Sequence, residues 1–279
     1  MLHLRRTVRF CLDDSDAPTP PRHNGHAGWP PMRGLGRYYE LQIHCIGKAD
    51  PVTGYFIIIR EIDQAFAQHA LPVLRQAVGN RPAEAPLGTL LQRVLEALQP
   101  PLNHTVASLC LQLTPFYSLA IRSDQMRHVT MRQQFDFSAA HRLHVPHLSD
   151  EENRRIFGKC NNPAGHGHNY QLEVAVEAPI GPDGRVVELE KLDALVDGVV
   201  IQKLDHKHLN MDVPEFAQLN PTVENIARVI FELLEPAVGE LGVRLAEVSV
   251  WETPKTVCTY RGEREAVTSP SSGCHFPAT

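Results

Sequence analysis

The apolar and polar positions in the second half of the chain alternate first as strands and then recur at helical spacing. The predicted order is strand, strand, helix, helix, strand, strand. The segments are residues 129–139, 169–178, 190–203, 222–238, 245–252 and 256–261. Residues 144–167 are predicted to be a polar loop, and GPDG at 181–184 predicts a hairpin turn that returns through 186–189. Thr222 is expected to cap the second helix.

The first half of the chain repeats this order of elements. Its segments are residues 7–12, 38–47, 60–78, 86–100, 108–113 and 116–122. Tyr39 and Tyr170 stand 131 positions apart (170 minus 39), and each opens a strand with matching alternation, YELQIHCI and YQLEVAVE. A pattern that recurs from end to end predicts a tandem duplication.

The predicted fold class is therefore α+β, with tandem ββααββ units that each place two helices on one face of an antiparallel sheet. One unit is assigned to residues 1–125 and the other to 126–265. Residues 13–34 are rich in Pro, Gly and Asp and are expected to form a long loop. Residues 266–279 are expected to be a disordered tail.

The densest chemical signal is the segment GKCNNPAGHGHNY at 158–170. His166 and His168 are two positions apart as the chain enters a strand, so their imidazoles point to the same face. His141, in the preceding strand, supplies a third nitrogen if the two strands pair. Three histidines with one open position are typical of a catalytic zinc site, although imidazoles alone also suit copper, nickel or iron.

Several spaced motifs in this half resemble the family of 6-pyruvoyl-tetrahydropterin synthase, which includes 6-carboxytetrahydropterin synthase of the queuosine pathway. They are FDFSAAHRL, FGKCNNPAGHGHNYQLEV, LDHKHLN, PTVENIA and VSVWETPKTVCTYRGE, and they cover about residues 130–263. The resemblance implies the tunnelling fold (T-fold), whose units assemble side by side into a barrel. It also implies 7,8-dihydroneopterin triphosphate, a small-molecule substrate.

The resemblance also implies a role for each residue that matches a family motif. The histidine triad would hold Zn2+, and the other matches form a catalytic group and a substrate-binding group. The catalytic group is Cys160, Asp205 and His206; the substrate-binding group is Glu252, Thr222 and Glu224; the metal ligands are His141, His166 and His168.

These residue types suit the removal of a proton beside a polarised oxygen. A cysteine near a metal and a histidine is expected to have a lowered pKa and to act as a thiolate base. Asp205 would orient His206, and Glu252 would accept two hydrogen bonds from a pterin ring. Without the resemblance, Asp205 capping a turn and Glu252 as a solvated residue at a strand end remain open alternatives.

The substrate's triphosphate also needs cations. Four lie in the same loops, but surface solvation is their expected role. They are Arg142, Arg154, Arg155 and Lys159.

The first copy lacks the matching chemistry. When Tyr39 is aligned with Tyr170, GHGHNY becomes GLGRYY at 34–39, so both histidines are lost. In the same alignment Cys160 falls near Trp29, and Asp205 with His206 falls near Arg75 and Gln76. Glu252 falls on Leu113, and His141 falls near Asp14. A structural half-barrel is the favoured interpretation. A second binding site of different chemistry is the alternative, and no ligand pattern in residues 1–125 supports it.

Composition excludes several classes of protein. The formal net charge is −5 with histidines neutral, which does not favour a nucleic-acid-binding protein. No apolar run approaches the ~20 residues of a membrane helix, and the segment MLHLRRTVRF has no apolar signal core. A cytoplasmic protein without a membrane partner is expected. The resembled family closes its barrels by oligomerisation and builds its site between neighbouring units, so a homo-oligomer is expected, with residues 1–125 contacting a substrate site.

Two classes of function remain. The first is a zinc-dependent lyase that forms either the 6-pyruvoyl or the 6-carboxy tetrahydropterin. Five residues separate Cys160 from His166, which resembles the pyruvoyl type. A folate-pathway variant with a glutamate in this loop is disfavoured, because residues 161–165 are NNPAG. The second class is a non-catalytic pterin-binding or assembly protein, against which the intact Cys160, Asp205 and His206 argue.

Overall fold

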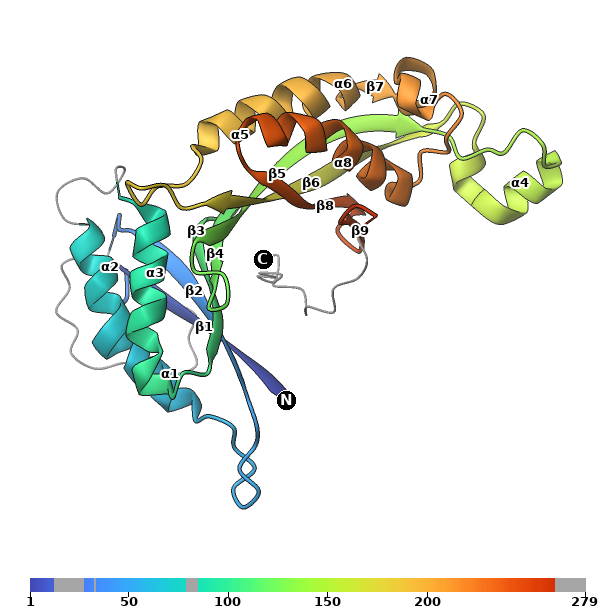
Figure 1. The fold of residues 1–279 in the computed structure, drawn as a ribbon. Coiled ribbons are helices and arrows are strands. Elements are labelled where there is room, and N and C mark those ends of the chain that lie inside the picture. The colour runs from blue at the N-terminus through green and yellow to red at the C-terminus, as the bar shows by residue number, and fades with distance from the viewer. Residues whose placement is uncertain (13–27, 33, 79–84, 264–279) are drawn as a thin grey trace. The chain divides into compact units, whose positions relative to one another are not determined.

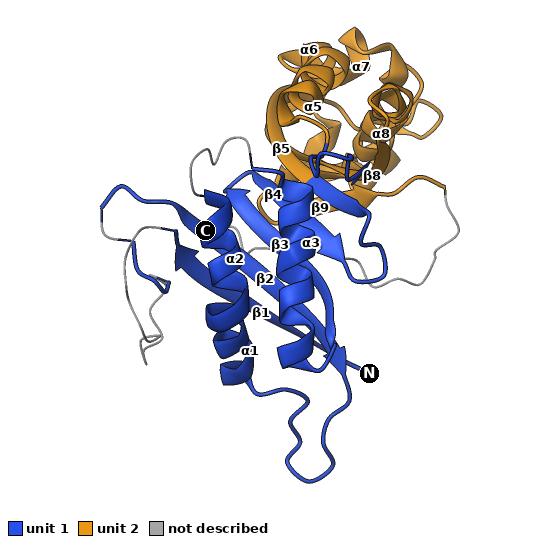
Figure 2. Ribbon diagram, turned by 60° about the vertical axis from the view of Figure 1, so that its left-hand side comes forward, with its two compact units in different colours: residues 1–131, 178–186, 269–279 blue, residues 132–177, 187–268 orange. Residues whose placement is uncertain are grey.

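The computed structural model describes residues 1–12, 28–32, 34–78 and 85–263. The chain divides into two compact units, coloured separately in Figure 2. Unit 1 consists of residues 1–131, 178–186 and 269–279, and unit 2 of residues 132–177 and 187–268. The expected long loop at 13–34 lies mostly outside the described residues, and the expected tail at 266–279 lies wholly outside them.

In the described part of unit 1, the strands are joined in the order β1-β2-β3-β4, and each neighbouring pair is antiparallel. Two strands precede its helices and two follow them. The elements are β1 (Leu2–Cys11), β2 (Tyr38–Gly47), α1 (Ile59–Ala65), α2 (Leu71–Val78), α3 (Leu87–Leu98), β3 (Val106–Thr114) and β4 (Tyr117–Arg122). A π-helical segment, Phe66–Ala70, joins α1 to α2, so residues 59–78 run as one helix with a local widening, where the sequence predicts one helix.

The core of unit 1 follows from strand alternation on one side and helical spacing on the other. Leu41, Ile43 and Cys45, at alternate positions of β2, have no exposed surface. On α3, Leu91, Leu95 and Leu98 recur at a helical interval and are buried to within 1%. Figure 2 shows the helices lying across one face of the four strands. The other face of this sheet carries polar and charged side chains.

Unit 2 has the same order of its main elements, with additions around the loops. Its strands are joined in the order β5-β6-β8-β9, with β6–β8 and β8–β9 antiparallel, and β7 pairs parallel with β5. The elements are β5 (His128–His141), α4 (Asp150–Phe157), β6 (His166–Pro179), α5 (Leu189–Val196), α6 (Gln202–Leu204), β7 (Lys207–His208), α7 (Leu209–Asp212), α8 (Val223–Glu240), β8 (Arg244–Thr253) and β9 (Thr256–Tyr260). A π-helical segment, Asp197–Ile201, joins α5 to α6.

The long helix α8 covers the sheet of unit 2 (Figure 1). Ile226, Ile230 and Leu234 recur every four residues and are fully buried. Thr222 caps the helix as the sequence predicts, because its side chain accepts a hydrogen bond from the backbone N–H of Asn225. The start of α8 is therefore fixed, and the functional site lies beside it.

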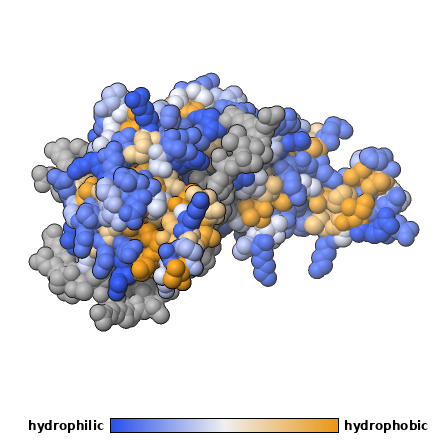
Figure 3. Space-filling model, turned by 60° about the horizontal axis from the view of Figure 1, so that its bottom comes forward, coloured by the Kyte–Doolittle hydropathy of each residue, from blue (hydrophilic) through white to orange (hydrophobic). Residues whose placement is uncertain are grey.

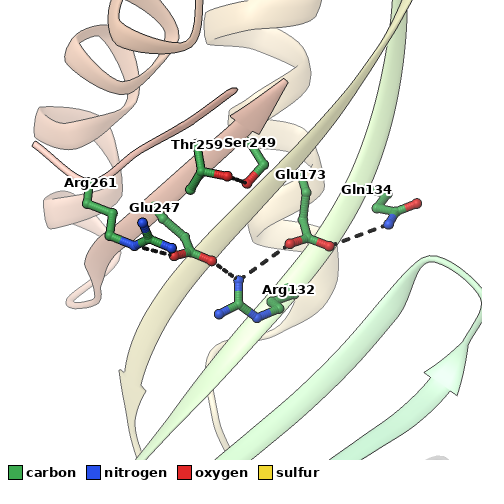
Figure 4. A network of polar contacts seen from close by, with 7 residues as sticks. All are labelled: Arg132, Gln134, Glu173, Glu247, Ser249, Thr259 and Arg261. Atoms are coloured by element: carbon green, nitrogen blue, oxygen red, sulfur yellow. Dashed lines mark hydrogen bonds and ion pairs between the residues drawn. The ribbon is translucent and has the colours of Figure 1, made fainter. Parts of the chain in front are cut away.

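The opposite face of this sheet carries a polar network that joins three strands (Figure 4). Arg132 of β5 is only 5% exposed and pairs with Glu173 of β6 at 3.4 Å and with Glu247 of β8. Arg261 donates from Nε to the other oxygen of Glu247 at 2.8 Å. Gln134 also contacts Glu173. The two carboxylates therefore hold the buried guanidinium between neighbouring strands.

Three local predictions are wrong. The predicted loop at 144–167 contains α4, which begins in a capping box formed by Ser149 and Glu152. No return strand forms at 186–189, because β6 pairs with β8 and α5 begins at Leu189. GPDG does form a turn, with the Gly184 N–H bonded to the Gly181 carbonyl and the Gly181 N–H bonded to the Arg185 carbonyl, but no strand follows it to complete a hairpin. The motif LDHKHLN contains the short β7 and part of α7.

The surface mixes polar and apolar side chains. On the face drawn in Figure 3, apolar patches lie among hydrophilic side chains. Exposed apolar residues include Val52 in unit 1 and Ile156 and Met211 in unit 2. Among the described helices, none has the length and apolar character required to cross a membrane.

Candidate metal and pterin site

The three predicted histidines meet on the helix-covered face of the unit 2 sheet. His141 ends β5, and His166 and His168 begin β6, which lies beside β5. One ring nitrogen from each lies within 4.8 Å of the others. The Nε2 atoms of His141 and His166 are 3.1 Å apart. Among the described residues, this is the single group of three or more His, Cys, Asp or Glu side chains that could hold a metal ion.

The second nitrogen of His141 fixes its orientation. Its Nδ1 lies 2.7 Å from the carbonyl oxygen of Pro221, directly before the Thr222 cap, and donates to it. The Nε2 atom therefore carries the lone pair and faces His166. His141 has no exposed surface. Burial lowers its pKa to about 4, and the neighbouring histidines act in the same direction, so the ring is neutral and able to ligate at neutral pH.

The unpartnered nitrogens of the other two histidines test whether the site suits a metal. Nδ1 of His166 and Nε2 of His168 are buried, and no described group hydrogen-bonds to either. Burial, then the charge of His168, lowers the pKa of His166. Buried polar atoms without partners are costly, and three imidazoles that converge from two strands form the nitrogen-rich donor set that zinc prefers. The residues therefore fit a zinc ion.

The carboxylate of Glu252 lies beside the triad. Oε1 of Glu252, near the end of β8, is 3.6 Å from Nε2 of His141 and 3.8 Å from Nε2 of His168. The predicted substrate residue therefore lies directly beside the predicted metal ligands. Thr222 is the N-cap of α8 and Glu224 lies in its first turn, and the Pro221 carbonyl directly before the cap accepts from His141.

Cys160 lies in a short 3₁₀ turn, Gly158–Asn161, and is partly buried. Its carbonyl accepts the N–H of Leu143, which ties the turn to the segment after His141. Burial raises the pKa of the Cys160 thiol, and the charge of Glu252 raises it further. This direction is opposite to the expected lowering, because burial and the nearby Glu252 carboxylate both disfavour the thiolate. A lowered pKa at Cys160 would need an added positive charge.

Asp205 and His206 form the expected pair, beside Ser138 of β5. The Asp205 carboxylate accepts the Ser138 backbone N–H at 2.8 Å and pairs with Nδ1 of His206 at 2.8 Å. The Ser138 N–H bond, followed by the His206 contact, lowers the pKa of Asp205. His206 has φ of +56°, and 83% of its side chain is exposed. Within the described part of the chain, no hydrogen bond or ion pair joins either side chain to Cys160, Glu252 or the triad.

The loops around the site are held by asparagine side chains, which sequence reasoning missed. Asn210 brackets Arg142, accepting its N–H at 2.8 Å and donating to its carbonyl at 3.0 Å. Asn161 donates to the carbonyl of Leu143. Asn153, fully buried inside α4, bonds Val145 in the same two-way manner. Each amide replaces the strand partner that the irregular backbone after β5 lacks.

Two further side chains at the site were also missed. His208 lies against Gly165, where an added Cβ would come within 2.7 Å of the His208 Nε2 and 3.0 Å of the His141 carbonyl oxygen. Gly165 also has φ of +73°, so this position needs glycine on both counts. Both ring nitrogens of His208 are buried without a described partner. Tyr170 stacks on Phe137 below the triad, and burial, then the charges of Glu252 and Cys160, raise its pKa.

Comparison with known proteins places the site in a family. The family model described as 6-pyruvoyl tetrahydropterin synthase matches residues 130–263. Human 6-pyruvoyl tetrahydrobiopterin synthase is 46% identical over 132 residues, which cover 90% of that protein and 47% of this chain. The chain belongs to the 6-pyruvoyl tetrahydropterin synthase family. It is thus an enzyme of the lyase class.

Other relatives match the same half of the chain. The family member from Poecilia reticulata is 44% identical over 143 residues, 94% of that protein and 50% of this chain. The solved structure of Caenorhabditis elegans 6-pyruvoyl tetrahydropterin synthase covers 49% of this chain and 96% of its own, at 42% identity and a TM-score of 0.46. A dihydroneopterin monophosphate aldolase from Pyrococcus furiosus is 43% identical over 88 residues. The predicted resemblance is confirmed, and so is the α+β T-fold class.

Proposed function

We propose that the chain is a zinc-dependent lyase that acts on 7,8-dihydroneopterin triphosphate. The observation that carries the proposal is the position of Glu252, whose carboxylate lies 3.6 Å and 3.8 Å from two nitrogens of the histidine triad. A carboxylate in this position can accept two N–H hydrogen bonds from a pterin ring and bring the ring's side chain to the metal ligands. Substrate recognition and metal chemistry then share one pocket.

His141, His166 and His168 would hold the zinc. When bound, the ion supplies Lewis-acid polarisation of the side-chain oxygens of the substrate. Cys160 then accepts the proton from the adjacent carbon as a thiolate, and its proximity to Glu252 and Tyr170 supports this position in the pocket. The pyruvoyl-type product is favoured, because five residues separate Cys160 from His166 and six of the relatives compared carry the 6-pyruvoyl name.

The Asp205–His206 pair would serve the site of a neighbouring copy of the chain. Its imidazole is 83% exposed, oriented by a carboxylate and presented on a positive-φ backbone, with no described bond to its own chain's triad. An exposed, oriented imidazole is suited to proton transfer at a site that assembly completes. The resembled family oligomerises, and we propose that this chain is a homo-oligomer and that residues 1–125 have a structural role.

Two experiments test these points. Zinc-loaded chain incubated with 7,8-dihydroneopterin triphosphate should release triphosphate, and mass spectrometry should detect a tetrahydropterin with a pyruvoyl side chain. A chain that binds the substrate and returns it unchanged would be a pterin-binding protein instead. Mixing the Cys160→Ala and His206→Ala variants, followed by reassembly, should restore part of the activity if the pair acts on a neighbouring copy. Mixtures as inactive as either variant alone would place both residues in one chain's site.

A further inference from the structure

Unit 1 carries a pair of histidines on the sheet face opposite its buried apolar residues. His3 lies on β1 and His44 on β2, where Arg5 pairs with His44 in the antiparallel register. His44 therefore lies diagonally across from His3 and on the other face of β2 from Ile43 and Cys45. Nδ1 of His3 is 3.1 Å from Nε2 of His44, and the two rings stack with centroids 5.2 Å apart.

The surroundings of His44 keep it neutral and fix its orientation. It is 8% exposed, and burial, followed by the charge of Arg5, lowers its pKa to about 4. Its Nδ1 lies 3.3 Å from the hydroxyl of Ser108 on β3. In the tautomer whose Nδ1–H donates to Ser108, the Nε2 lone pair points at His3. Two nitrogens facing each other at this distance share either a proton or a metal ion.

The separation suits a metal ion. Two nitrogens at zinc's usual bond length of about 2.0–2.1 Å and a tetrahedral angle lie about 3.3 Å apart. The separation of 3.1 Å between His3 and His44 equals that between His141 and His166 in the histidine triad. An outer hydrogen bond that fixes the tautomer, as Ser108 provides, is a usual companion of metal-ligating histidine.

We propose that His3 and His44 form a second divalent-metal site in unit 1, with Zn2+ as its ion and Ser108 as the positioning residue. His3 is exposed, so water completes the coordination. Binding requires the His3 proton to move from Nδ1 to Nε2 by exchange with solvent, so that both nitrogens facing the ion carry lone pairs and each ring stays neutral. With two protein ligands instead of three, this site binds zinc more weakly than the triad and is emptied by dialysis. The inference is independent of the lyase function.

The test is a titration of Zn2+ into full-length protein whose histidine triad already holds zinc. Calorimetry measures the binding, and NMR monitors the imidazole signals. The wild type should take up one further, weaker equivalent that shifts the signals of His3 and His44. His3→Gln should lose it, and because His3 is exposed this change leaves the core intact. Ser108→Ala should weaken it by about 10- to 100-fold. His69→Gln, an exposed histidine on the helical side of the same unit, is the matched control and should behave as wild type.

Thermal melting supplies a second measurement. Added zinc should raise the melting temperature of the wild type, because the folded state alone presents the paired nitrogens. The same zinc should have a smaller effect on His3→Gln. The proposal is overturned if His3→Gln retains the further equivalent at unchanged affinity, or if the wild type takes up no zinc beyond the triad.

Discussion

Replacing Arg132 with methionine tests the buried ion network of unit 2. The guanidinium is 5% exposed and bridges Glu173 and Glu247, whose side chains are 15% and 12% exposed. Methionine keeps the apolar stem of the side chain and removes the charged guanidinium, so Glu247 stays buried with Arg261 as its remaining partner. Removing one partner of a buried ion pair lowers the free energy of unfolding by about 3 kcal/mol or more. For a domain of this size, that corresponds to a melting temperature lower by roughly 10 °C.

The matched control is Arg261→Met, which removes the other arginine that pairs with Glu247. Arg261 is 55% exposed, so its pair with Glu247 is screened and its loss costs under about 1 kcal/mol. Urea unfolding followed by Trp251 fluorescence, in a Trp29→Phe background, reports on unit 2 directly. Equal losses for the two variants, or a loss under about 1 kcal/mol for Arg132→Met, would refute the reasoning that burial sets the magnitude.

The pH dependence of the stability of Arg132→Met tests the sign of the contribution from Glu247. Burial acts to raise the pKa of Glu247, but the charge of Arg132 and the hydrogen bonds from Arg132 and Arg261 outweigh it, and the pKa lies below the ordinary 4.5. A carboxylate with a depressed folded-state pKa contributes stability above its ordinary pKa and loses it as the pH falls. Without Arg132, burial dominates. The difference between wild type and Arg132→Met should therefore shrink as the pH falls through about 4.5.

Three further predictions concern the site and the first copy. Dialysed protein should hold about one zinc per chain, as a single triad predicts. His166→Ala should lose both zinc and activity. Two tightly held zincs per chain would contradict the prediction that residues 1–125 lack a strong metal site. Cys160→Ala should keep zinc and fold while losing most turnover, and His206→Ala should behave alike; loss of zinc from Cys160→Ala would make the thiol a ligand. Residues 126–279 expressed alone should be insoluble or weakly active and partly rescued by the first half, whereas a soluble, fully active fragment would show that the first copy is dispensable.

The strand pattern predicted most of the fold because burial on one face imposes a strict period of two. The prediction at 38–47 matches β2 at both ends. The helix α4 was missed because its residues are mostly charged and its Ile156 is 54% exposed, so no apolar stripe marks it. Its capping box, Ser149 with Glu152, was the available signal. The return strand predicted at 186–189 does not form, because β6 pairs with β8 instead. The local pattern does not encode this choice of partner.

The metal ligands were predictable because two of them lie on one strand and the third on its neighbour. His208 was not, because it reaches the site through the parallel pairing of β7 with β5, which joins residues 68 positions apart (208 minus 140). The pairing of His3 with His44 depends in the same way on strand register. The duplication stays a prediction. It is supported by the buried positions of β2 and β6, where Leu41 and Leu172 hold equivalent places counted from Tyr39 and Tyr170.

The most direct test of the proposed function links metal occupancy to turnover on one sample. Zinc content and triphosphate release from 7,8-dihydroneopterin triphosphate would be measured together as a chelator removes zinc and as zinc is restored. The account predicts that the rate falls in proportion to the zinc lost from the triad and returns when about one equivalent per chain is restored. Triphosphate release that continues after the triad has lost its zinc would contradict it.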